Sequence, residues 1–528
     1  MNEVFQYVES NLGKNLKYSE KLDFFVTLPN NSSIHVKQLY YDKYQSSNVI
    51  NDTNFDEIRS ILPSKLKIKE YLHKFTSIYG FFPILNIQKF DLVIKNVLNK
   101  DVLDNNEFIS LGNLLVMLKV IDYLSDEILD SKFIPIAEHI LKKFGGENLN
   151  SLILINLLKF FYQVSPDDFS KNNLRKFQKY EIESLRLAYC LGIEFSENND
   201  DKKLWYLINQ PNLNNVILNG FPLDLAKNHK LKIPNVEMSF LNNDNDQCPE
   251  SKSVNQTSLE KLLVDKISFY PNFQINYNKL VQRILISKDH INLNEVLNIL
   301  HQLKFKLPYD KKYPKNIYKL FKIENFFHVT YIKIILLYHY FKYYQKEKSH
   351  KSNSVLDCML KLIYKSLLPI IVKIYSFENE LSKLIDLIFS PIVNNLIELV
   401  WMINISLIIQ VKSQIENILP LEKILSNDYY NNLVVFQKKL INSNNLLLII
   451  LKSNKRNFQN FKLSIILPIL QDNVLNAKQI VNLKTPVEGI GEDFIVDFKN
   501  LINDNLHDYL ALVNSKLFTD STDSDDLE

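Results

Sequence analysis

The chain has 528 residues, 46% of them hydrophobic, and a formal net charge of +3. This length allows a large buried core, and the near-neutral charge excludes a global basic field for holding nucleic acid. Only nine residues are glycine, and glycine is what phosphate-cradling loops, dinucleotide folds and tight β-hairpins require. The composition therefore argues against nucleotide-binding enzymes and against β-rich folds.

Helical periodicity dominates the chain from its first third onward. A helix is predicted to open after Leu62-Pro63-Ser64, and one face of it carries Ile68, Tyr71, Leu72, Phe75, Ile78 and Tyr79. A second apolar stripe consists of Leu293, Val296, Leu297, Leu300 and Leu303. Four stretches are long or apolar enough to be buried helices, namely residues 326–345, 366–374, 381–410 and 444–452. We therefore predict an all-α fold.

Prolines and one polar stretch indicate where helices and domains end. Helix ends or kinks are predicted at Pro83, Pro135, Pro166, Pro211, Pro222, Pro308, Pro369, Pro391 and Pro420, because proline lacks the amide donor. Residues 242–258 have almost no large apolar side chain and read as a linker. No short-period repeat is evident, which disfavours a regular solenoid.

These boundaries predict five segments. They are an N-terminal arm (1–45), a first helical half (46–235), a polar linker (236–258), a second helical half (259–515) and an acidic disordered tail (516–528). The tail is expected to aid solubility, although docking on a basic partner is the alternative.

The distribution of cysteines and apolar runs indicates the compartment. The chain contains three cysteines, Cys190, Cys248 and Cys358. They lie too far apart for a disulfide framework, which fits a reducing compartment. Residues 1–20 lack the apolar core of a signal peptide. The best membrane candidate, residues 387–411, is interrupted by Glu398 into runs shorter than the about 20 residues a span needs. We therefore expect a soluble intracellular protein with no membrane partner.

Motifs for known chemistry are absent. The sequence has no P-loop, CxxC, HExxH or GxSxG pattern, and the lone GxG at Gly489 and Gly491 is expected to be a turn. Cys190 follows Leu187 and Ala188, and we expect it to be a buried, inert thiol. We therefore predict a protein that is not an enzyme, with no catalytic residue, cofactor or metal.

Two basic runs interleaved with tyrosines are candidates for contact with nucleic acid. The candidate residues are Lys311, Lys312, Lys315, Lys342, Lys346 and Lys348. The competing interpretation is a pair of solvated helix ends whose tyrosines lie half in the core. Composition favours this second interpretation, because Lys and Asn are abundant throughout the chain in the manner of an AT-rich genome.

Two stretches resemble the fungal-specific transcription factor domain, the middle homology region of fungal zinc-cluster regulators. In residues 61–98 the likeness rests on Leu62-Pro63 and on the aromatic turn Phe82-Pro83. In residues 181–208 it rests on Arg186, Gly192 and Trp205, where one helix is expected to end at Gly192 and the next to turn Trp205 inward. The resemblance implies a large, irregular multi-helix body.

Weaker collinear likenesses extend over most of the chain and are similar to the zinc-cluster subunits of the yeast RSC chromatin-remodelling complex. They lie near Leu28, Phe108, His290 and Phe326. The zinc-cluster subunit of the inner-kinetochore centromere-binding complex shares this architecture. Family members normally begin with six closely spaced cysteines, whereas this sequence has none before Cys190 and cannot build that site. Two explanations are open: the protein lacks this module, or this sequence starts after it. Direct sequence-specific recognition of DNA is therefore not expected.

The resemblance implies a non-catalytic, nuclear scaffold or regulatory subunit of an RSC-type remodelling complex that acts in transcription regulation. Its expected partners are other subunits of that complex, with a homologous paralogue as a candidate heterodimer partner and indirect contact with DNA or nucleosomes. The alternatives are the effector domain of a stand-alone fungal transcription regulator, which senses a small molecule or recruits coactivators, and an inner-kinetochore subunit.

Overall fold

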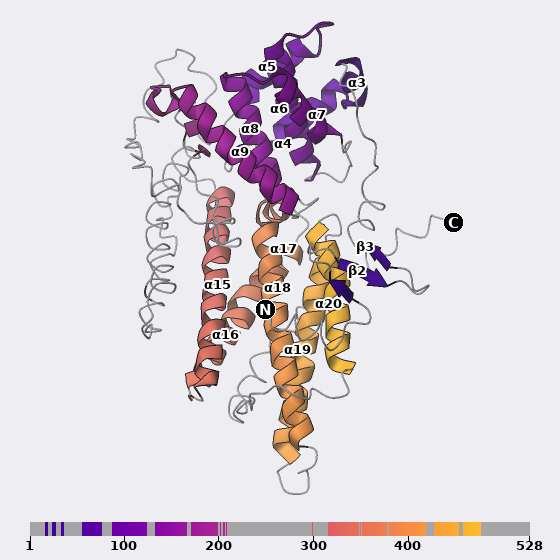
Figure 1. The fold of residues 1–528 in the computed structure, drawn as a ribbon, viewed down its shortest axis with the longest axis vertical. Helices are drawn as coiled ribbons and strands as arrows, with labels where there is room; N and C mark the ends of the chain where they lie inside the picture. The colour runs from indigo at the N-terminus through magenta and orange to yellow at the C-terminus, as the bar shows by residue number, and fades with distance from the viewer. Residues whose placement is uncertain are drawn as a thin grey trace, which may run out of the picture. The chain divides into compact units, whose positions relative to one another are not determined.

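The structure is a computed structural model in which most of the helical part of the chain is described. The described ranges are 16–18, 24–27, 33–35, 55–75, 87–123, 132–165, 171–198, 315–347, 351–376, 380–418, 427–453 and 458–476, together with positions 201, 204, 205, 207, 208, 298 and 349. Most of these residues are helical, so the predicted all-α class is confirmed (Figure 1). The predicted linker, the acidic tail and the stripe that begins at Leu293 lie outside the described residues.

Three short strands are present in the segment predicted to be an N-terminal arm. They are β1 (Leu16–Tyr18), β2 (Phe24–Thr27) and β3 (Ser33–His35). The strands form an antiparallel sheet in the order β1-β2-β3, in which Leu16 pairs with Val26 and Phe25 pairs with His35. Helical periodicity gave no indication of this sheet.

The chain divides into two compact units. The N-terminal unit contains Ser46–Phe326 and Lys383–Phe389, and the C-terminal unit contains Met1–Gln45, Phe327–Ser382 and Ser390–Glu528. The main elements of the N-terminal unit are α3 (Phe55–Ile61), α4 (Lys65–Phe75), α5 (Ile87–Val97), α6 (Asn105–Asp122), α7 (Phe133–Phe144), α8 (Leu149–Val164), α9 (Lys171–Cys190) and the 3-10 turn η2 (Ile193–Phe195).

Helix α4 follows its sequence prediction closely. Ser64 caps its start, because the Ser64 carbonyl accepts from the Ile68 amide at 2.9 Å and the Ser64 hydroxyl accepts from the Lys67 amide at 3.4 Å. The predicted face is buried at every position that the structure describes, namely Ile68, Tyr71, Leu72 and Phe75. Ile78 and Tyr79 lie outside the described residues. Local periodicity and one cap are therefore sufficient to define this helix.

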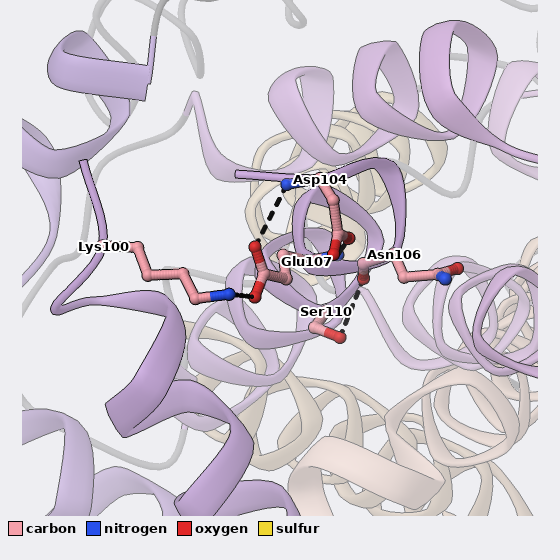
Figure 2. Close-up of polar contacts among 5 residues, drawn as sticks. All are labelled: Lys100, Asp104, Asn106, Glu107 and Ser110. Carbon is pink, nitrogen blue, oxygen red and sulfur yellow. Dashed lines mark hydrogen bonds and ion pairs between the residues drawn. The ribbon is translucent and has the colours of Figure 1, made fainter. Parts of the chain in front are cut away.

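Helix α6 is the central helix of the N-terminal unit and packs against α7 and α8. Residues 109–122 are all buried, so the helix has no solvent-exposed face after its first turn. A capping box fixes its start: Asp104 accepts from the Glu107 amide at 2.9 Å, and Glu107 accepts from the Asp104 amide at 3.1 Å (Figure 2). Glu107 also pairs with Lys100.

The remaining long helices include all four stretches predicted to be buried. They are α15 (Lys315–Lys346), α16 (Lys351–Lys361), the π-helix η4 (Leu362–Leu367), α17 (Leu368–Ser376), α18 (Glu380–Ile418), α19 (Asn427–Ser453) and α20 (Phe458–Asn476). Within the C-terminal unit α19 packs against α20 and α17. The observed helices are longer than the predicted stretches. The prediction followed apolar residues, and the ends of these helices are more polar.

Helix α18 contains both a proline and a long apolar run. Pro391 lies inside the helix and does not end it. Asp386–Glu416 is long and apolar enough to cross a membrane, but 89% of the tested window is buried inside the structure. Such burial is typical of the core helix of a folded domain, which passes the same test of length and composition.

Candidate docking surface

The outer face of α9 carries large apolar side chains that the rest of the chain leaves exposed. Ile182 is 65% exposed, and Arg186 and Tyr189 follow it at spacings of four and three residues, which place all three on one helical face. Just beyond the helix, Phe195 in η2 is 82% exposed. We refer to Ile182, Arg186, Tyr189 and Phe195 as the α9–η2 surface.

The turn at Gly192 determines where Phe195 lies. Gly192 has φ +64°, a left-handed conformation that glycine adopts without strain. Its carbonyl accepts from the Phe195 amide at 3.0 Å, which closes η2. Trp205 is helical, buried, and packed edge-on against Tyr189 with 5.3 Å between ring centroids. Both predictions for this motif, a helix end at Gly192 and an inward Trp205, are confirmed.

Arg186 lies in the middle of the surface and is only loosely held. Its guanidinium is 3.9 Å from carboxylate oxygens of both Glu147 and Glu183, and all three side chains are solvent-exposed. Exposed ion pairs of this length contribute little, because water and salt screen them. The guanidinium can therefore turn to a partner's carboxylate at small cost.

Polar contacts beneath the surface fix α9 to its neighbours. Glu138 of α7 accepts hydrogen bonds from the Tyr162 hydroxyl, the Tyr180 hydroxyl and the Lys176 ammonium, each at 2.9 Å. Burial and the Glu138 charge raise the pKa of Tyr162 and of Tyr180, so both phenols remain protonated donors. The α9–η2 surface is therefore presented on a rigid support.

A second contact between α8 and α9 places a lysine in the core. Lys159 is buried, with its ammonium 3.6 Å from Glu181 and 5.7 Å from the centre of the Phe177 ring. Burial lowers the pKa of Lys159, and Glu181 opposes this only in part. The unfolded chain therefore binds the proton of the Lys159 ammonium more tightly than the folded chain does. Lys159 lowers the free energy of unfolding at neutral pH, and this destabilisation decreases as pH rises toward 10.5.

We expect Lys159→Met to stabilise the protein by about 1 kcal/mol at pH 7, because the replacement removes a buried charge and keeps the packing volume. The gain over wild type should shrink as pH rises toward the ordinary lysine pKa. Urea unfolding at several pH values measures both effects. Lys179→Met is the control, since Lys179 lies on the neighbouring helix α9 and is exposed. A destabilised Lys159→Met variant would contradict the expectation.

The predicted site residues are only partly brought together. Leu62 and Pro63 are half-buried in the connection between α3 and α4. Phe82, Pro83, Lys311, Lys312 and Lys348 lie outside the described residues. Lys315 begins α15, while Lys342 and Lys346 lie in its last two turns. Arg186 and Gly192 belong to or adjoin the α9–η2 surface, and Trp205 supports it from below.

The prediction that Cys190 is buried is wrong, because its thiol is exposed. The buried face of α9 runs through Phe177, Tyr180, Ser184 and Leu187, and helical geometry directs Cys190 away from that row. Apolar sequence neighbours therefore did not imply burial. Cys358 on α16 is also exposed, and partial desolvation raises its pKa. A raised pKa disfavours the Cys358 thiolate and therefore nucleophilic chemistry at Cys358.

The C-terminal unit contains a buried chain of amide hydrogen bonds that the sequence analysis missed. Asn404 of α18 accepts from the Tyr364 hydroxyl at 3.0 Å and donates to Asn444 at 2.9 Å and to Ser443 at 3.3 Å. Asn444 in turn donates to Gln471 of α20 at 3.0 Å. Burial raises the pKa of Tyr364 to about 12. This amide chain joins four helical elements, η4, α18, α19 and α20. All its members are uncharged at neutral pH, so it is a structural network and does not transfer protons.

Within the described residues, no three histidine, cysteine or acidic side chains gather in a way that could hold a metal ion. The described residues provide the exposed α9–η2 surface on its rigid support, the buried amide chain of the C-terminal unit and a basic end of α15. Comparison with protein-family models, characterised proteins and solved structures gives no significant match, so any role for this chain rests on these features and on its sequence.

Proposed function

We propose that the chain is a non-catalytic scaffold subunit of a nuclear complex, specifically an RSC-type chromatin-remodelling complex that acts in transcription regulation. The sequence support is the resemblance of residues 61–98 and 181–208 to the fungal transcription factor domain. The structural observation that carries a docking role is the α9–η2 surface, in which Ile182 and Phe195 are exposed beside Arg186.

Such a surface has the composition of the binding centre of a protein interface. Arginine and aromatic residues provide most of the affinity in measured interfaces, and a rigid support lowers the entropy lost on binding. Burying a large apolar side chain such as Phe195 contributes about 2 kcal/mol. The occupant that we propose is another subunit of the same complex, with an apolar patch for Ile182 and Phe195 and a carboxylate for Arg186.

The proposal is tested by affinity purification of the tagged full-length chain, followed by size-exclusion chromatography and mass spectrometry. Recovery in a megadalton assembly with an ATPase subunit is expected. Recovery as a free dimer bound to coactivators would instead support a stand-alone transcription regulator, and recovery with centromere proteins would support the kinetochore alternative.

The docking surface is tested by the double variant Ile182→Glu/Phe195→Glu. Both side chains are exposed, so the fold should be retained, while two carboxylates placed against an apolar partner should lower partner recovery at least about tenfold. The matched control is Leu66→Glu/Val102→Glu, because these residues are 80% and 83% exposed in the same unit but away from α9. Equal recovery from both double variants would contradict docking through α9.

A further inference from the structure

The turn between α15 and α16 gathers basic and aromatic residues in the C-terminal unit. We define the α15–α16 elbow as Tyr340, Lys342, Tyr343, Tyr344, Lys346 and Lys351. The turn is tight: the Tyr344 carbonyl accepts from the Ser349 amide at 2.9 Å, and the Ser349 hydroxyl accepts from the Lys351 amide at 3.3 Å. Lys346 and Lys351 are therefore held on either side of a short hydrogen-bonded turn.

The tyrosines of the elbow are arranged around Tyr344. Its ring stacks on Tyr340 at 6.2 Å and meets Tyr343 edge-on at 5.4 Å. The Lys351 ammonium lies 5.9 Å from the centre of the Tyr344 ring. The Tyr343 side chain is 40% exposed. The cluster thus offers one accessible ring that its neighbours hold in place.

The charge of the elbow is unbalanced. Residues 341–351 read FKYYQKEKSHK, with four lysines and one glutamate. Lys346 is exposed and makes no ion pair with the residues that the structure describes. Elsewhere in this part of the fold, Lys361 is paired with Asp357 at 2.6 Å. Lys346 therefore retains a positive charge that no carboxylate of the described residues neutralises.

We propose that the α15–α16 elbow binds a single strand of nucleic acid. Lys342, Lys346 and Lys351 contact phosphates, and the exposed Tyr343 ring stacks on a base. A nucleic-acid strand supplies both groups at once, whereas an acidic peptide supplies only the negative charge. This inference goes beyond the proposed function, because a scaffold needs no contact with nucleic acid of its own.

Fluorescence anisotropy of the purified full-length chain with a labelled single-stranded oligonucleotide tests the proposal. Lys346→Glu/Lys351→Glu should weaken binding at least about tenfold, and it should reduce the slope of log affinity against log salt by about 1.4, since two phosphate contacts are lost. Tyr343→Ala should weaken binding of the single strand more than binding of the duplex of the same sequence, because paired bases cannot stack on the ring.

The control is Lys365→Glu/Lys373→Glu, which changes the same charge at two exposed lysines of the same unit. Lys365 lies about 20 Å from Lys351 along one helical run, at about 1.5 Å per residue. This control should bind the oligonucleotide as wild type does. The proposal is overturned if the two double variants lose affinity equally, if the elbow variant binds normally, or if polyglutamate of equal charge competes as well as the oligonucleotide. These outcomes do not depend on which complex contains the chain.

Discussion

Replacing Asn404 with leucine should destabilise the C-terminal unit by about 3 kcal/mol. The substitution keeps the side-chain volume but removes three buried hydrogen bonds, those that Asn404 makes with the Tyr364 hydroxyl, the Ser443 hydroxyl and the Asn444 amide oxygen. An unpaired buried polar group costs about 1–3 kcal/mol, and the Asn444 amide oxygen loses the donor that Asn404 provides, while each further lost hydrogen bond adds about 1 kcal/mol. Because Asn404 and Asn444 are fully buried, water cannot reach them as a substitute.

The two tryptophans of the chain make this measurement specific. Trp205 lies in the N-terminal unit and Trp401 lies in α18 of the C-terminal unit. Urea unfolding followed by Trp401 fluorescence in a Trp205→Phe background therefore reports on the unit that contains the amide chain. Asn395→Leu is the control on the same helix, since Asn395 is half-buried and, among the described residues, bonds to the carbonyl of Pro391 in its own helix.

A double variant separates the amide chain from simple packing. Asn404→Leu/Asn444→Leu should lower the free energy of unfolding by less than the sum of the two single variants. Each single variant leaves the other asparagine buried without its bond partner, whereas the double variant removes both asparagines. Strict additivity, or an Asn404→Leu variant as stable as wild type, would show that these bonds do not join the helices as described.

Gly112→Val should destabilise the N-terminal unit by about 2 kcal/mol. A Cβ atom at Gly112 would lie 2.9 Å from a methyl carbon of Leu154 and 3.3 Å from one of Ile140, so α6 could no longer approach α7 and α8 as closely. Overpacking of a dense core typically costs about 1–3 kcal/mol. The gain in helix propensity over glycine is below about 1 kcal/mol and opposes this cost only in part.

The unfolding of this unit can be followed by Trp205 fluorescence in a Trp401→Phe background. Gly146→Val is the matched control, because a Cβ at Gly146 meets only the Asn148 side chain, at an ordinary 3.5 Å. We expect the control to remain within about 0.5 kcal/mol of the parent. A Gly112→Val variant as stable as the control would mean that the helices can move apart without loss.

The sequence alone was sufficient wherever the information is local. The start and the buried face of α4 follow from Ser64 and from the spacing of apolar residues. The end of α9 follows from Gly192, since few other residues adopt positive φ. The four apolar stretches fall in helices because apolar length predicts buried helix. The all-α class is the sum of such local signals.

Tertiary structure decided what depends on partners distant in sequence. Helix α9 carries apolar residues on two faces, and periodicity cannot tell which face the rest of the protein covers. Packing on α8 buries the row from Phe177 to Leu187, which leaves Ile182 and Tyr189 outside and also exposes Cys190. The bonds of Asn404 are equally invisible in sequence, because their partners lie about 40 residues away on other helices. The spacing of side chains in the sequence predicts which residues share a helical face, whereas only tertiary packing determines whether that face contacts another helix or solvent.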